Sequence, residues 1–197
     1  TTPAVSAEVS AVDRHARQPV LLLAGAGLVW LVASGALALI ASIQTHSPSF
    51  LTDCAWFTHG RVQAMRESAF VYGWAANAGL ATLLWILGRL GGSALRGAGW
   101  TVVGTIFWNL GLLVGLGGIA AGHMTSVALL QLPRYVQPLM LAAYAAIAIT
   151  GVLAWSGRRT DATFASHWYA VAALFLFPWF TGAAQAALLW EPLRGSL

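Results

Sequence analysis

The stretch Phe57–Arg89, FTHGRVQAMRESAFVYGWAANAGLATLLWILGR, decides the fold of this chain. It opens with a compact polar turn, runs from Ser68 to Gly88 without a charged residue, and closes on a basic side chain. At about 1.5 Å of rise per residue, a helix over this charge-free span covers the roughly 30 Å hydrocarbon core of a bilayer. The sequence therefore predicts a membrane-spanning helix here, around which the rest of the chain packs.

Further charge-free runs of similar length and composition lie on either side of this stretch. They are Pro19–Ile43, Gly97–Ala121, Val136–Trp155 and His167–Trp190. Because a helix is the open-chain way to satisfy every backbone group inside lipid, each run predicts one spanning helix. The predicted fold is all-α, a polytopic membrane bundle of five transmembrane helices.

The composition agrees with a membrane location. Of the 197 residues, 58% are hydrophobic and 8% are charged, whereas soluble domains average about 25% charged residues. The net charge of +4 comes entirely from arginine, and the arginines stand singly or in pairs at the ends of apolar runs. This placement is typical of membrane topology and argues against a nucleic-acid partner.

The chain is predicted to form a single membrane domain over residues 19–190. A polar, partly disordered tail at 1–18 precedes it, and a short tail at 191–197 follows it. One side of the predicted bundle has six arginines, Arg14, Arg17, Arg89, Arg96, Arg158 and Arg159, and the other has four, Arg61, Arg66, Arg134 and Arg194. The positive-inside rule then places the N-terminus in the cytoplasm and the C-terminus outside.

The predicted spans contain no Asp, Glu, Lys or Arg, so we expect no proton or ion path confined to this chain and assign no catalytic residue. Asn77 and Asn109 are amides that lipid does not tolerate without partners. They are expected to hydrogen-bond between helices, with the lining of a cofactor or water cavity as the alternative.

The third predicted span also carries glycines at small-xxx-small spacing, which lets helix backbones approach closely. Ordinary packing and a contact seam for a partner subunit both explain such spacing. These glycines are Gly111, Gly115, Gly118 and Gly122.

Three histidines, His46, His59 and His123, fall on the predicted outer side, and Asp53 and Cys54 lie near two of them in the sequence. Imidazoles and a thiolate together can bind zinc or copper. However, no two of the histidines have the i, i+4 spacing of a helix, and histidines are common at membrane interfaces. The sequence therefore favours interfacial residues over a metal site.

The polar turn and the apolar run after it form a specific pattern, Gly60–Arg66 (GRVQAMR) followed by Ser68–Asn77 (SAFVYGWAAN). It resembles the start of the second helix in the catalytic subunit of cbb3-type haem–copper oxidases, where a Gly-Arg-Leu-x-Pro-Leu-His turn leads into an apolar helix with a Gly/Ala-rich Asn segment. The similarity continues in order through Phe107–Asn109, Leu132–Tyr135 and Ala165–Tyr169. The chain corresponds to the N-terminal five helices of a subunit that normally has twelve or more.

The resemblance implies a haem-ligand position that this chain does not fill with histidine. In the family, the histidine that closes the turn is an axial ligand of the low-spin haem b, and the corresponding residue here is Arg66. A guanidinium stays protonated and has no lone pair to give to iron. His59, two helical turns earlier, is a weaker candidate ligand. Arg66 is expected either to anchor the helix at the lipid head groups or to pair with an acidic partner subunit or a haem propionate.

Two functions follow from the resemblance. The first is a membrane subunit or segment of a cbb3-like cytochrome c oxidase or related respiratory complex, with haem b and copper held by partner segments or subunits. The alternative is a haem-free membrane scaffold or assembly partner derived from the oxidase fold. In both, the chain binds no cofactor alone, its partners are the lipid bilayer and other membrane subunits, and its location is the bacterial inner membrane.

Overall fold

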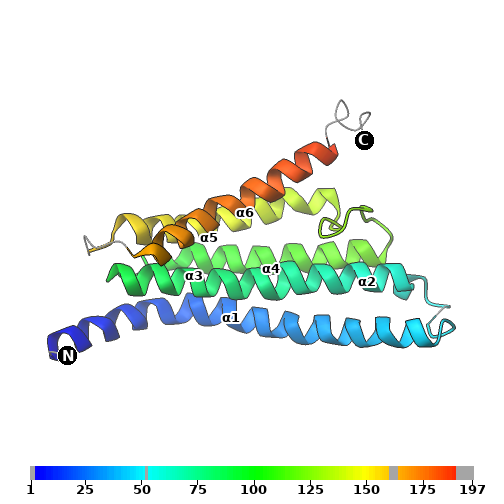
Figure 1. Ribbon diagram of the computed structural model, residues 1–197, viewed down its shortest axis with the longest axis horizontal. Helices are drawn as coiled ribbons and strands as arrows, with labels where there is room; N and C mark the ends of the chain where they lie inside the picture. Colours follow the sequence, from blue (N-terminus) through cyan, green and yellow to red (C-terminus); the bar gives the residue numbers. More distant parts are fainter. Residues whose placement is uncertain (1–2, 52, 160–163, 190–197) are drawn as a thin grey trace.

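The computed structural model describes residues 3–51, 53–159 and 164–189, and every regular element in these ranges is helical (Figure 1). Two single 3₁₀ turns, Ala55–Phe57 and Arg134–Val136, precede α2 and α5. The longer elements are α1 (Pro3–His46), α2 (His59–Ser68), a π-helix (Ala69–Ala75), α3 (Ala76–Gly91), α4 (Ala98–Ala120), α5 (Gln137–Ser156) and α6 (Ala165–Leu189).

The predicted helical membrane bundle is confirmed. Four segments in the described ranges are long and apolar enough to cross a bilayer, namely Asp13–His46, His59–Gly91, Ala98–Ala120 and Arg134–Ser156. The fifth predicted span falls within α6, apart from its last residue, Trp190, which lies outside the described residues. Large apolar side chains such as Val32 and Trp179, 74% and 77% exposed, face outward from α1 and α6. Such surfaces indicate contact with a lipid bilayer.

Two predictions about the polar segments are wrong. The turn predicted at 59–67 is helix α2, continuous with the π-helix and α3. Gln63 donates to a Glu67 carboxylate oxygen one turn on, at 2.8 Å, and Arg61 donates to the carbonyl groups of Ala55 and Ala120. These bonds let polar residues extend the helix beyond the apolar span. Residues 3–18 are likewise helical rather than partly disordered, whereas the predicted tail at 191–197 lies outside the described residues.

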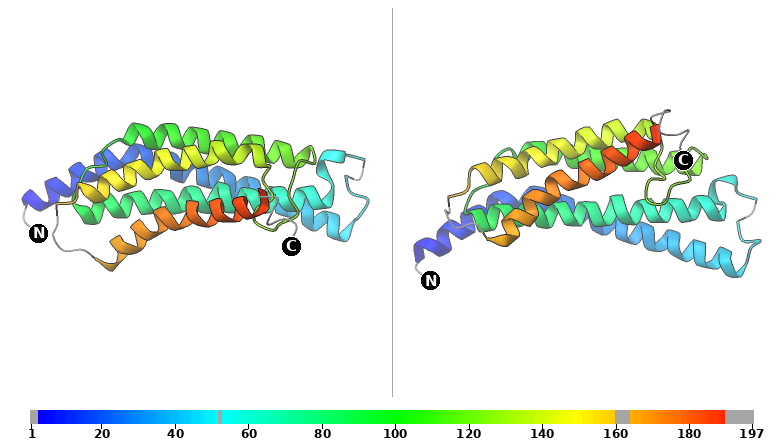
Figure 2. Two further views of the ribbon diagram at one scale, coloured as in Figure 1. Left: turned by 90° about the horizontal axis from the view of Figure 1, so that it is seen from above. Right: turned by 45° about the horizontal axis from the view of Figure 1, so that its top comes forward.

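The helices run back and forth between two ends of the bundle (Figure 1). One end holds the start of α1, the α3–α4 connection and the end of α5, and the other holds the α1–α2 and α4–α5 connections. At the first end, Arg89 pairs with Asp13, and the Arg159 N–H donates to the Gly91 carbonyl at 2.9 Å. α1 packs along α2, the π-helix and α3, while α6 packs on α3 and α5 away from α1 (Figure 2).

The glycine face of α4 packs against the same chain. A Cβ atom at Gly111 would lie 3.1 Å from the Met140 side chain, and one at Gly115 would lie 2.7 Å from that of Leu132. A Cβ atom at Gly118 would lie 2.7 Å from the Pro133 ring. Gly122, at φ +97°, lies against the Arg61 guanidinium. Of the two explanations of the glycine spacing, packing within the chain accounts for the contacts of Gly111, Gly115, Gly118 and Gly122, which face α5, the loop before it and α2.

Helix α6 is held on α5 by a proline-dependent contact. Pro178 has no N–H, so the carbonyl of Leu174 lacks its usual helical partner. The Tyr144 hydroxyl on α5 donates to this carbonyl at 3.2 Å. Beside it, the Leu174 side chain fills the space that a Cβ at Gly151 would occupy, at 2.6 Å.

The closest approach of α1 to the π-helix is at Gly73. A Cβ atom there would lie 2.5 Å from Cγ and 2.6 Å from Cβ of Trp30. These atoms are near the Trp30 backbone, so the indole cannot move aside without shifting α1. Glycine is therefore required at this point of the helix.

We predict that Gly73→Ala lowers the free energy of unfolding by about 1–3 kcal/mol, because the added methyl group overpacks the contact with Trp30. The matched control is Gly79→Ala in α3, where a Cβ meets nothing within 4 Å. Thermal unfolding in detergent measures both variants. Equal stability of Gly73→Ala and Gly79→Ala would contradict the packing described here.

Candidate functional site

A hydrogen-bonded cluster joins three helices in the centre of the bundle. The Trp30 indole N–H on α1 donates to Asn109 Oδ1 on α4 at 2.6 Å. Asn77 on α3 and Asn109 exchange hydrogen bonds through their amides at 3.1 and 3.2 Å. Asn77 is fully buried. The interhelical hydrogen bonding predicted for Asn77 and Asn109 is confirmed, and it lies within this chain rather than at a partner contact.

The π-helix beside this cluster offers backbone carbonyl groups to neighbouring side chains. Trp108 Nε1 on α4 donates to the Tyr72 carbonyl at 2.8 Å, and Asn77 Nδ2 donates to the Gly73 carbonyl at 2.6 Å. A π-helix departs from the regular i→i+4 ladder, and neighbouring groups satisfy the carbonyls that this departure affects. The irregular turn is thus part of the packing between α3 and α4.

A cleft of about 640 Å³ opens between α1 and α2, and we call it the Arg66 cleft. Small or apolar residues of α1 and the π-helix form most of it. Arg66 and Glu67 stand together at its polar part. The lining residues are Leu31, Ser34, Gly35, Ala38, Arg66, Glu67, Phe70, Val71 and Leu129.

Glu67 has hydrogen-bond partners for both of its oxygens, whereas Arg66 lacks a partner for one of its N–H groups. Glu67 accepts hydrogen bonds on both carboxylate oxygens, from Gln63 at 2.8 Å and from Gln131 at 2.7 Å. The Arg66 Nη2 atom lies 3.7 Å from Glu67 Oε1, beyond hydrogen-bond distance. The Arg66 Nε–H is buried and has no hydrogen-bond partner among the described residues. Arg66 therefore keeps unused donor capacity.

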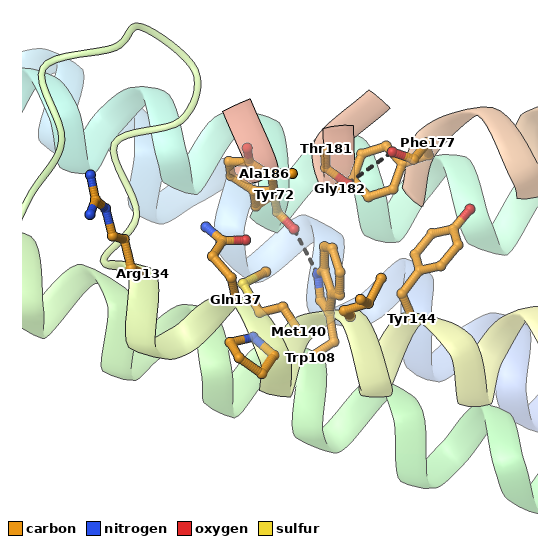
Figure 3. Close-up of a pocket in the computed structure, with 12 residues that line it drawn as sticks. Tyr72, Trp108, Arg134, Gln137, Met140, Tyr144, Phe177, Thr181, Gly182 and Ala186 are labelled. Atoms are coloured by element: carbon orange, nitrogen blue, oxygen red, sulfur yellow. Dashed lines mark hydrogen bonds between the residues drawn. The ribbon is translucent and has the colours of Figure 1, made fainter. Parts of the chain in front are cut away.

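A second cavity, of about 330 Å³, lies between the π-helix, α4, α5 and α6 (Figure 3). Four aromatic side chains, Tyr72, Trp108, Tyr144 and Phe177, line its apolar part. Figure 3 shows Arg134 and Gln137 toward the N-terminal end of α5. The Tyr72 hydroxyl donates to the Leu129 carbonyl at 2.6 Å, so this end of the cavity is tied to the α4–α5 loop.

The three outer histidines have separate surroundings. His46 Nδ1 lies 2.9 Å from the Ser42 carbonyl of its own helix, and the His123 ring meets Tyr135 edge-on. His59 is exposed at the start of α2. In the part of the chain that the structure describes, no three His, Cys, Asp or Glu side chains gather where they could hold a metal ion.

Arg66, which the sequence resemblance aligns with a haem ligand, does not fit a haem. Arg66 lines the cleft there, and its guanidinium cannot coordinate iron. His59 lies nearly two turns earlier, on the exposed first turn of α2, and is not among the residues that line the Arg66 cleft.

Comparison with known proteins adds no relative. The chain matches no protein-family model and no curated protein.

The sequence did not indicate that the α4–α5 loop contacts Tyr72 and Glu67 beside the two cavities. Leu129 has a positive φ of 66°, which is uncommon for a residue other than glycine, and its carbonyl accepts the Tyr72 hydroxyl. Gln131, two residues on, reaches Glu67. Neither residue belongs to a recognisable motif, so only their polarity or position at a span end could have drawn attention to them.

We predict that Asn109→Leu destabilises the bundle by about 1–2 kcal/mol, because it leaves the Trp30 indole and the Asn77 amide without their partner. The loss in Asn77→Leu plus Asn109→Leu should be smaller than the two single losses together, since each single change already breaks the pair. The free energy of unfolding in mixed micelles is measured for the unchanged chain, the two single variants and the double variant, which together form a double-mutant cycle. The control is Thr82→Val, because the Thr82 hydroxyl bonds only within α3, to Ala78. Strictly additive losses would contradict the coupling.

Proposed function

We propose that this chain is a haem-free membrane subunit, or segment, of a cbb3-like oxidase or a related respiratory electron-transfer complex. Its redox centres, haem b and copper, belong to partner segments or subunits. The proposal rests on the ordered resemblance of Gly60–Asn77 and the later motifs to the oxidase subunit. A helical membrane bundle is the architecture that this proposal requires.

Arg66 is the observation that carries the haem-free part of the proposal. It occupies the position of the family's axial histidine, lines a cleft at the end of the apolar span, and cannot bind iron. The neighbouring Glu67 is held by hydrogen bonds from Gln63 and Gln131. This supports a retained fold that does not use the ligand position for iron.

The proposed location is the bacterial inner membrane, with the N-terminus in the cytoplasm and the C-terminus outside. The uneven arginine count of the two sides supports this orientation. Because the glycine seam and the central amides are used inside the chain, any contact with partner subunits must use the outward-facing surfaces. The exposed aromatic side chains of α6, such as Trp168 and Phe180, offer one such surface.

The proposal is tested with the full chain tagged in its native membrane. We expect haem-containing oxidase subunits to co-purify with it, and we expect the chain expressed without them to show no reduced haem b band. The variant His59→Ala should leave both results unchanged. A haem b band from the chain alone would refute the assignment of Arg66. Co-purification with membrane proteins that hold no redox centre would favour the scaffold function instead.

A further inference from the structure

We infer that the Arg66 cleft is a binding site for an anionic phospholipid, whose phosphate meets the Arg66 guanidinium and whose acyl chain lies between α1 and the π-helix. This site does not depend on the proposed oxidase association. It follows from the donors of one arginine, the shape of the cleft and its depth in the membrane.

The first argument is the unmet donor capacity of Arg66. Its Nε–H is buried without a partner among the described residues, and its contact with Glu67 is a long one of 3.7 Å. Leaving a buried charged donor unsatisfied is costly, more so than for a neutral group. Glu67 cannot turn toward it without giving up Gln63 or Gln131. An anionic acceptor from outside the chain would satisfy the guanidinium, for which phosphate is a preferred partner.

The second argument is the shape of the cleft beyond the arginine. Gly35 and Ala38 leave room along α1, and Leu31, Phe70 and Val71 supply apolar walls. A Cβ at Gly35 would meet nothing within 4 Å, so the space is open at this point. The Ser34 hydroxyl is already bonded to the Leu31 carbonyl at 2.9 Å. The part of the cleft beyond Arg66 and Glu67, which we call the apolar track, therefore suits a hydrocarbon chain.

The third argument is depth in the membrane. Arg66 stands two residues before the charge-free span that begins at Ser68. This is the level at which phospholipid head groups meet the hydrocarbon core. The side chain of Arg66 is 37% exposed, so a phosphate can reach it while Nε remains enclosed. A lipid of the surrounding bilayer meets the charge and the apolar track at once, whereas a free phosphate meets only the charge.

The experiment uses the purified full chain in a non-ionic detergent. Dioleoyl phosphatidylglycerol and dioleoyl phosphatidylcholine are added in equal amounts, and native mass spectrometry measures the bound lipid. We expect the anionic lipid to be preferred by about fivefold or more, the factor expected for one arginine at the membrane surface. Arg66→Gln should abolish this preference, and Gly35→Phe should reduce binding of both lipids by filling the apolar track.

Matched controls separate the site from general charge and size effects. Arg96→Gln removes an exposed arginine at the other end of the bundle, and Gly25→Phe adds the same ring to α1 at another open position. Both should bind lipid like the unchanged protein. The inference is overturned if Arg66→Gln keeps the preference, if both lipids bind equally to the unchanged chain, or if glycerol phosphate alone competes as well as the lipid.

A photo-crosslinking measurement tests the occupant in native membranes. The change is Phe70→p-benzoylphenylalanine, which places the reactive group on the wall of the cleft and leaves the open space at Gly35 unfilled. We expect lipid adducts, identified by mass. Adducts to another protein would show that a partner helix occupies the cleft and would overturn the inference.

Discussion

A polar group in the hydrocarbon layer needs a partner from the protein, and this constraint organises the bundle. Trp30, Asn77 and Asn109 satisfy one another across α1, α3 and α4. Their contact is possible only because Gly73 lets the indole reach the π-helix. Close backbone approach and interhelical hydrogen bonding therefore depend on each other, as is usual when helices pack without a hydrophobic driving force.

Polar groups at the centre of the bundle have more complete hydrogen bonding than those at its edge. At the centre, amide, indole and π-helix carbonyl groups find partners within the chain. At the edge, Arg66 retains an enclosed donor without one among the described residues. The segment that runs from α2 through the π-helix to α3 thus combines a well-packed interior face with a cationic group at its edge.

Sequence predicted the spans well because charge-free length alone determines them, and α4 begins and ends within one residue of its predicted bounds. It also predicted that Asn77 and Asn109 would bond between helices, since lipid leaves them no other choice. It did not identify which partner each would find. The helical state of 59–67 was missed although Gln63 and Glu67 have the i, i+4 spacing of a helix, and the Arg61–Ala120 contact that also supports it depends on packing with α4. Trp179 is exposed, because Leu174 sets the face of α6 that packs on α5.

The attachment of α6 has a consequence for biogenesis. The central hydrogen bonds and the glycine seam of α4 use only residues that precede α6 in the chain. As the chain emerges from the ribosome, α1 to α5 can therefore assemble before α6 is inserted, in keeping with the tendency of N-terminal units to fold first. The Tyr144 hydroxyl and the open space at Gly151 are then already in place to receive α6 when it leaves the translocon.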